Sequence, residues 1–533
     1  MNFFNRAIKN VTRKLSTTIL LIITFFVIGN FVIIGLSVAK ASESAKILTR
    51  KKMRAVVKYE IDYDSFYQAG DQIEDEDERN EFFNNYPSIY YKDVKDILKD
   101  TRVKTANAIT TNSFYAPEGG IDFVRLNNKY EDSYMNSGQQ CYMDENGNSI
   151  CETYIEPTFI TKANFFPDMI EFSDGDYSVK QGRFYSQEEI NNGSKVCLIT
   201  EALAKANGLS VGEHITLQIQ QLNKEYEAAG ITTEDVTCDF QIIGIYSHNN
   251  AITPDNSNFD YLSPCENPDN MILTPSSTLY NISTNIQQKL WEYYKNDPDN
   301  YFYQDEANKP QVVPIDDIPI YDITFLLNDP LEVDQFVEEY NMNPGEYKKF
   351  TANNEEFEKL SKPLDTLSDY ANFIVWLVVI NSVVIITLVT ALTLKTREYE
   401  IGVLLSVGAS KLKVILQFFI ELALVALIGF TLSIASGSVI SKKVGGILLD
   451  NQIQSSGIVE EENWGGDYYS PWDNDYTTDI TLEDIMSEYD VTVSPLIIAE
   501  IYVVGLGIVL VSVIIPSFMI MRYNPKKILM NQY

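Results

Sequence analysis

The chain has 533 residues and a formal net charge of -33. A chain this acidic is not expected to bind nucleic acid, because phosphate backbones attract clustered Lys and Arg. It is also not a disordered acidic spacer, since 45% of its residues are apolar and it contains 33 Tyr and 27 Phe. The composition therefore predicts a folded protein.

Four long apolar segments dominate the sequence, one near the N-terminus and three near the C-terminus. They comprise residues 15–39, 371–394, 414–440 and 496–521. Each is longer than the roughly 20 residues that a helix needs to cross the hydrocarbon core of a bilayer. We therefore expect four transmembrane helices, with a large domain of residues 40–370 inserted between the first two.

The inserted domain is expected to be of the α+β class and large enough for two compact subdomains. Its strand-like runs are rich in β-branched residues, and helical stretches such as residues 330–340 intervene. The clearest strand-like runs are residues 195–200, 215–220, 240–246 and 320–327.

Positive charge gathers in three short segments, residues 1–14, 395–413 and 522–533. They contain eleven basic and two acidic residues, a local balance of +9, so the rest of the chain has a charge of about -42. Short loops rich in Lys and Arg stay on the cytoplasmic side of a membrane. We therefore expect both termini inside the cell, and both the 40–370 domain and the acidic 441–495 loop outside.

Two interpretations exist for the first apolar segment, a retained helix and a cleaved secretory signal. Its 25 residues exceed the core of about 7 to 15 that signal peptides use. No Gly or Pro occurs from residue 36 to residue 69. These features favour a retained helix that continues outward as a stalk.

Five Cys residues give limited information. Cys141 and Cys151 flank the turn signal Asn146-Gly147, so they either form a hairpin disulfide on an oxidising cell surface or remain free thiols. Cys197 and Cys238 fall in strand-like runs and are expected to be small core residues.

Catalytic signatures are missing from the sequence. It has no GxxxxGK[ST] phosphate-binding loop, no HExxH and no paired CxxC, and its two His residues are His214 and His248. We therefore expect neither an enzyme acting alone nor a metal or cofactor held by this chain.

Residues 396–417 have the pattern of a short amphipathic helix followed by a turn. Ile401, Leu404, Leu405 and Gly408 are spaced to form one apolar stripe. Gly408 suits the left-handed residue that ends a helix, and Ser410 can cap the next one. Such a helix could dock into a groove on a soluble partner or lie on the membrane interface.

Two acidic residues lie inside predicted spans, where an ionisable group is costly unless it is paired or faces water. Glu421 lies about 12 Å beyond Lys413 at 1.5 Å per residue. It either makes a contact that changes between conformational states or only fixes helix packing. Glu500 lies near the outer end of its span, where it can reach the interface.

The pattern in the 395–413 loop resembles the FtsX/MacB-like permeases of ABC transporters. Residues 182–217, closed by 240–246 and with Gly208 and Gly212 at turns, resemble the extracytoplasmic core domain of that family. Residues 522–529 resemble its C-terminal ending. The matching loop positions, which the resemblance assigns to ATPase coupling, are Arg397, Glu398, Glu400, Ile401, Gly402, Leu405, Gly408 and Ser410.

The resemblance implies a permease subunit in a bacterial cell membrane. It implies a second permease subunit, identical or related, and two copies of a separate ATPase that binds ATP and Mg²⁺. Such transporters are expected to work by mechanotransmission and to export or expel an amphipathic substrate such as a peptide. Within the family, the alternative is a signal transmitter that activates a cell-wall enzyme or senses an antibiotic. Outside it, the alternative is a receptor or scaffold.

Two segments depart from the family pattern. The 441–495 loop is long and contains Trp464, Trp472 and the acidic run Glu460, Glu461 and Glu462, so it either binds a partner or is a hydrated acidic loop. The stretch of residues 247–319 is also longer than the core pattern needs, and the sequence does not indicate its role.

Overall fold

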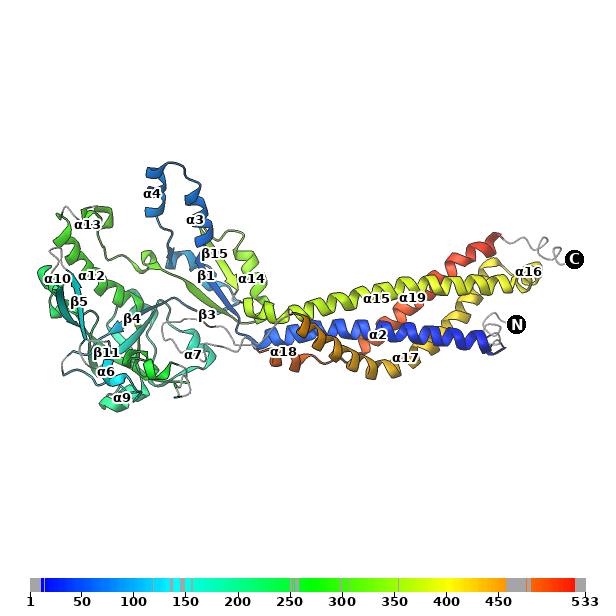
Figure 1. Ribbon diagram of the computed structural model, residues 1–533, viewed down its shortest axis with the longest axis horizontal. Helices are drawn as coiled ribbons and strands as arrows, with labels where there is room; N and C mark the ends of the chain where they lie inside the picture. Colours follow the sequence, from blue (N-terminus) through cyan, green and yellow to red (C-terminus); the bar gives the residue numbers. More distant parts are fainter. Residues whose placement is uncertain are drawn as a thin grey trace. The chain divides into compact units, whose positions relative to one another are not determined.

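The structure is a computed structural model of the chain (Figure 1). It describes residues 11–13, 15–117, 119–134, 138–143, 149–154, 157–249, 252, 254, 258–297, 300–304, 306–352, 354–456, 476 and 481–522. The chain divides into two compact units. The helical unit comprises Met1–Lys52, Asn354–Glu461 and Asp479–Tyr533, and the sheet unit comprises Met53–Asn353 and Glu462–Thr478.

The helical unit contains four long apolar helices at the four predicted spans. Among the described residues, these four are long and apolar enough to cross a membrane. They are α2 (Leu15–Lys52), α15 (Glu355–Thr396), α17 (Lys411–Ser456) and α19 (Pro495–Arg522). Two short helices, α16 (Glu398–Ser406) and α18 (Leu482–Glu488), complete the unit.

Helix α2 packs along α15 and α17, and α19 packs against the same two helices (Figure 1). Small residues allow the backbones of α2 and α17 to approach closely. A Cβ atom added at Gly29 would lie 2.2 Å from Oγ of Ser433, and one at Gly429 would lie 2.6 Å from Cβ of Phe25. Close packing of this kind is how helices associate in a membrane, where lipid tails are as apolar as Leu.

Three of the long helices extend well beyond the predicted spans. Helix α15 begins at Glu355, well before the span predicted from residue 371. Helix α2 continues without a break to Lys52, so the expected stalk is present. Helix α17 continues to Ser456, and the predicted 441–495 loop therefore begins as a helix.

The smaller sheet of the sheet unit has the strand order β15-β1-β14-β3, and every pair is antiparallel. Its core contains Val57, Ile323, Phe325 and, from helix α14, Phe336. The elements are β1 (Val56–Ile61), β3 (Val103–Asn107), β14 (Ile323–Leu327), α14 (Val333–Tyr340) and β15 (Lys348–Ala352). A helical hairpin of α3 (Tyr63–Asp71) and α4 (Glu76–Asn84) follows β1.

The larger sheet is seven-stranded, with the order β10-β11-β9-β12-β7-β4 and with β8 also paired to β11. The β9/β11 and β7/β12 pairs are parallel, and the other pairs are antiparallel. The strands are β4 (Ile109–Phe114), β7 (Phe159–Asn164), β8 (Tyr177–Gly182), β9 (Val196–Thr200), β10 (His214–Gln218), β11 (Thr237–His248) and β12 (Met271–Pro275). Helices α9 (Glu201–Asn207) and α12 (Ser276–Tyr294) follow β9 and β12.

Each predicted strand-like run overlaps an observed strand, and the predicted α+β class is confirmed. Gly208 and Gly212 lie at turns with φ of 65° and 99°. The stretch of residues 247–319, whose role the sequence did not indicate, supplies strand β12 in the interior of the larger sheet. It also supplies α12, so this stretch is part of the fold.

The sheet unit contains further short elements. They are β2 (Ile89–Tyr90), α5 (Tyr91–Val94), α6 (Glu131–Tyr134), β5 (Gly138–Met143), β6 (Ser149–Tyr154), α7 (Ile170–Asp174), α8 (Gln187–Asn191), α10 (Lys224–Ala228), α11 (Thr233–Val236), α13 (Tyr301–Gln304) and β13 (Pro319–Ile320). In the β5/β6 hairpin, Cys141 is the direct cross-strand partner of Cys151. Their side chains lie outside the described residues, so the two alternatives, a disulfide and two free thiols, both stay untested. Cys197 and Cys238 are buried free thiols, as predicted for small core residues.

Candidate functional site

The joint between α15 and α16 is the best-defined polar site in the helical unit. Helix α15 ends at Thr396 and α16 begins at Glu398, while Arg397 between them has φ of -106° and ψ of 13°. This conformation turns the chain without a loop. It also directs the Arg397 side chain toward α17, where its guanidinium lies 5.6 Å from the ring centroid of Phe418.

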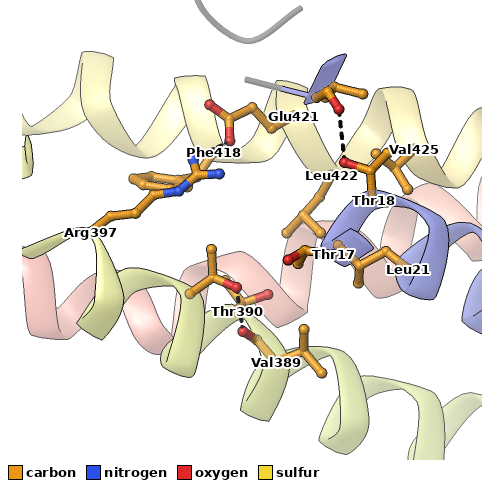
Figure 2. Close-up of a pocket in the computed structure, with 12 residues that line it drawn as sticks. Thr17, Thr18, Leu21, Val389, Thr390, Arg397, Phe418, Glu421, Leu422 and Val425 are labelled. Atoms are coloured by element: carbon orange, nitrogen blue, oxygen red, sulfur yellow. Dashed lines mark hydrogen bonds and ion pairs between the residues drawn. The ribbon is translucent and has the colours of Figure 1, made fainter. Parts of the chain in front are cut away.

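Arg397 forms a buried ion pair with Glu421 of α17 (Figure 2). Nη1 of Arg397 lies 2.7 Å from Oε2 of Glu421, and the two side chains are 7% and 10% exposed. Gln417 donates a hydrogen bond of 3.1 Å to the other carboxylate oxygen. Removing one partner from such a pair leaves an uncompensated buried charge, which typically costs about 3–5 kcal/mol. The pair therefore fixes the start of α16 to α17.

A small cavity of about 50 Å³ adjoins the ion pair. Its lining comes mainly from three long helices, α2, α15 and α17, and includes Thr17 and Thr390 (Figure 2). Thr393 lines the same cavity. Nε of Arg397 is buried and has no hydrogen-bond partner within the described part of the chain. The lining is mainly apolar but includes these Thr hydroxyls, and a cavity of this size has room for a water molecule that could bond to that group.

The inner face of α16 packs on the chain's own helices. Ile401 is 1% exposed and forms a cluster with Leu394, Val414 and Phe418, against which Leu405 also packs. Gly402 is buried on the same face. Ile401 and Leu405 of the predicted apolar stripe thus pack α16 on α15 and α17, whereas Gly408 of the stripe is exposed.

A second apolar row on α16 faces outward. It consists of Tyr399, Val403 and Val407, of which Val407 is 82% exposed. Glu400 is exposed as well, and Glu398 is half-buried. The sequence analysis missed this row because the amphipathic pattern does not say which of two apolar faces a helix buries.

The turn after α16 has the predicted geometry. Gly408 has φ of 93°, a left-handed conformation that side chains disfavour. Oγ of Ser410 accepts a hydrogen bond of 3.4 Å from the backbone N–H of Lys413, in the first turn of α17. Both predicted roles, helix termination and helix capping, are therefore observed.

Glu500, the second predicted acidic residue in a span, pairs with Lys40 of α2 at 2.7 Å. Two further ion pairs join the extended part of α2 to its neighbours, Lys46 with Asp365 at 2.8 Å and Lys52 with Glu488 at 2.6 Å. These partners could not be recognised from the sequence, since they come from helices far apart in the chain.

The acidic run and the two Trp residues predicted for the 441–495 loop lie outside the described residues. Tyr476 of the same loop is described and is buried in the sheet unit, with 6% exposure. Within the described part of the chain, no group of three or more His, Cys, Asp or Glu side chains is placed to hold a metal ion.

Comparison with protein families gives two matches. The model of the FtsX-like permease C-terminal region matches residues 372–525, which include α16 and the Arg397–Glu421 pair. The model of the MacB-like periplasmic core domain matches residues 27–339, which include the whole larger sheet and strands β1, β3 and β14 of the smaller one.

Among curated proteins, the chain is similar to YclI of Bacillus subtilis (strain 168), described as an uncharacterized ABC transporter permease. The two are 25% identical over 444 residues, which cover 83% of this chain and 80% of YclI.

Two solved structures also match. The periplasmic region of MacB from Actinobacillus actinomycetemcomitans has 10% sequence identity and a TM-score of 0.26, over 57% of this chain and 92% of that one. The extracellular domain of the ABC-type transporter YknZ from Gram-positive bacteria has 9% identity and a TM-score of 0.25, over 56% of this chain and all of that one.

Proposed function

Because the chain belongs to the FtsX/MacB-like family of ABC transporter permeases, we propose that it works by mechanotransmission and exports or expels an amphipathic substrate such as a peptide. A separate ABC ATPase, present in two copies and binding ATP and Mg²⁺, supplies the energy. A second permease subunit, identical or related, completes the transporter. The sheet unit is extracellular, and both termini and α16 are on the cytoplasmic side of a bacterial cell membrane.

The observation that supports this proposal most directly is the arrangement of α16. Its inner face is fixed by the Arg397–Glu421 pair, and its outer face presents Tyr399, Val403 and Val407. An amphipathic helix with an exposed apolar row suits a groove on a soluble partner. We assign the outer row as the surface that contacts the ATPase.

Movement of α16 would be transmitted to two long helices at once. Helix α15 ends beside Arg397 and is 42 residues long, about 63 Å at 1.5 Å per residue. Its single internal helix breaker is Pro363. Helix α17 is joined to the same point through Glu421, so a displacement of α16 acts on both without an intervening flexible loop.

The experiment that tests this proposal is co-purification of the full-length chain with an ABC ATPase from the same organism. Val403→Asp combined with Val407→Asp should abolish capture of the ATPase, because two charges would replace two of the three residues of the apolar row. The matched control is Val312→Asp, since Val312 is a half-exposed Val of the sheet unit. Full capture by the double variant would contradict the docking surface.

A second measurement tests energy coupling. Replacing Glu400 and Gly402 together with Leu should leave the chain inserted in the membrane. It should nevertheless reduce peptide-stimulated ATP hydrolysis, because Gly402 is buried where α16 meets its neighbours. Peptide-stimulated hydrolysis without movement of peptide would support the signal transmitter and contradict export.

A further inference from the structure

A cleft of about 420 Å³ lies in the sheet unit, between the elements of the two sheets. Its walls come from the hairpin α3/α4, from β13 and its flanks, from β4 and from α12. None of the described residues that line it is charged. The volume falls within the range of about 300 to 1,000 Å³ that is usual for small-ligand sites.

Tyrosine rings form the mouth of the cleft. Tyr63 and Tyr86 are nearly half exposed, with ring centroids 6.0 Å apart, and Tyr321 is 80% exposed. Tyr280 of α12 lines the interior and donates a hydrogen bond to the carbonyl of Gln311. Exposed aromatic residues are usually scattered singly, and a cluster around a cavity marks a binding surface.

The mouth lies at the base of an acidic hairpin. Tyr63 opens α3 and Tyr86 follows α4, so both ends of the hairpin line the cleft. Residues 63–86 contain eight acidic residues and one basic residue, Arg79, a balance of -7. The residues of the acidic run from Glu74 to Glu78 are all exposed to solvent. A field of this sign concentrates cationic molecules at the uncharged cleft beneath it.

We infer that the cleft binds the apolar side chains of a cationic amphipathic peptide, while its basic groups face the acidic hairpin and the tyrosine rings. Uncharged aromatic walls remove apolar side chains from water, and ring faces attract cations. This inference rests on the proposed function and names the site where the sheet unit holds its substrate.

The test uses the full-length protein in nanodiscs of zwitterionic lipid without the ATPase. A fluorescein-labelled peptide of alternating Lys and Leu is titrated, its anisotropy is followed, and binding to empty nanodiscs is subtracted. Tyr321→Ser and Tyr63→Ser should each weaken binding by about three- to tenfold, the usual contribution of one aromatic or cation–π contact. Tyr293→Ser is the matched control, because Tyr293 is similarly exposed but lies about 20 Å along α12 from Tyr280.

Two further arms test the shape and the charge of the site. Ser283→Trp places a large ring in the cleft from an exposed position of α12, so it should block binding without disturbing the core. Neutralising Glu76, Asp77 and Glu78 to Gln, Asn and Gln should weaken binding at low salt and flatten its salt dependence. A peptide with Glu in place of Lys should bind far more weakly.

Unchanged affinity in both Tyr variants and in Ser283→Trp would overturn the inference. Failure of the cleft can be told apart from failure of the proposed function. If the peptide stimulates the ATPase equally in wild type and in the cleft variants, the cleft is not the peptide-binding site, and the proposed export function is not contradicted. If the cleft variants lose peptide binding but the Val403→Asp, Val407→Asp variant still captures the ATPase, the cleft is the peptide-binding site. In that case the outer row of α16 is not the surface that contacts the ATPase.

Discussion

The hydroxyl of Tyr476 donates a hydrogen bond of 3.2 Å to Oε1 of Glu171, although the two residues are 305 positions apart. Asn107 donates to both, at 2.6 Å to the phenol oxygen and 3.0 Å to the carboxylate. Burial raises the pKa of Tyr476 well above its ordinary value, so the phenol remains a neutral donor. Tyr476 is thereby held inside the sheet unit, at the point where β3 leads into β4.

Loss of the Tyr476 side chain should therefore destabilise the sheet unit. We expect Tyr476→Ala to lower its free energy of unfolding by about 3–5 kcal/mol, as for other buried aromatic residues. Tyr476→Phe should cost about 1–3 kcal/mol, because Glu171 and Asn107 lose a partner. Thermal unfolding of the full chain in detergent measures both, with the exposed Tyr293→Ala as control. Equal melting of Tyr476→Ala and the control would mean that this contact is not stabilising.

Disrupting the Arg397–Glu421 pair should affect stability and coupling differently. Arg397→Met or Glu421→Met alone should destabilise the helical unit by about 3–5 kcal/mol, since each leaves one buried charge without its partner. The double Met variant should recover most of that stability, because apolar residues can replace a buried ion pair at little cost.

The same double variant separates a packing role from a switching role. If the ion pair changes between conformational states, the double variant should fold and bind the ATPase but lose peptide-stimulated ATP hydrolysis. Wild-type hydrolysis in the double variant would show that the pair serves packing alone. Melting temperature and ATPase rate of the co-purified complex distinguish the two.

Local features of this chain could be predicted from the sequence, because they depend on neighbouring residues. The four spans follow from apolar length, and the conformations of Gly408 and Ser410 follow from their positions after an amphipathic run. Arg397 and Glu421 were each recognised as candidates, but their pairing depends on the bend between α15 and α16.

Features that depend on tertiary contacts could not be predicted. Tyr476 lies in a polar, acidic stretch whose composition favours solvent exposure, and its burial depends on Asn107 and Glu171, which are far away in the sequence. Strand β12 is a short apolar run within a segment rich in Asn, Asp and Pro, and its neighbours β7 and β9 come from distant parts of the chain. The burial of Tyr476 and the interior position of β12 both depend on contacts between distant parts of the chain.

Cys141 and Cys151 lie directly opposite each other in the β5/β6 hairpin, so the possible disulfide between them can be tested. Directly opposite residues of an antiparallel pair have Cα atoms about 4.5–5.5 Å apart, within the range that a disulfide spans. A bond closing a loop of about ten residues should stabilise the folded state by up to about 3 kcal/mol. Alkylation of the unfolded protein with and without prior reduction, followed by intact mass measurement, counts the bonded thiols. Two alkylated thiols at these positions before reduction would exclude the bond.

The proposed orientation predicts opposite labelling of two exposed positions. Met342 of the sheet unit and Ser410 of the α16–α17 turn are both exposed to solvent. In a background with Ser at positions 141 and 151, Cys at Met342 should react with a membrane-impermeant maleimide on intact cells. Cys at Ser410 should react only after permeabilisation, because the basic segments around it favour retention in the cytoplasm. The reverse pattern would place α16 outside the cell, where no ATPase could drive it.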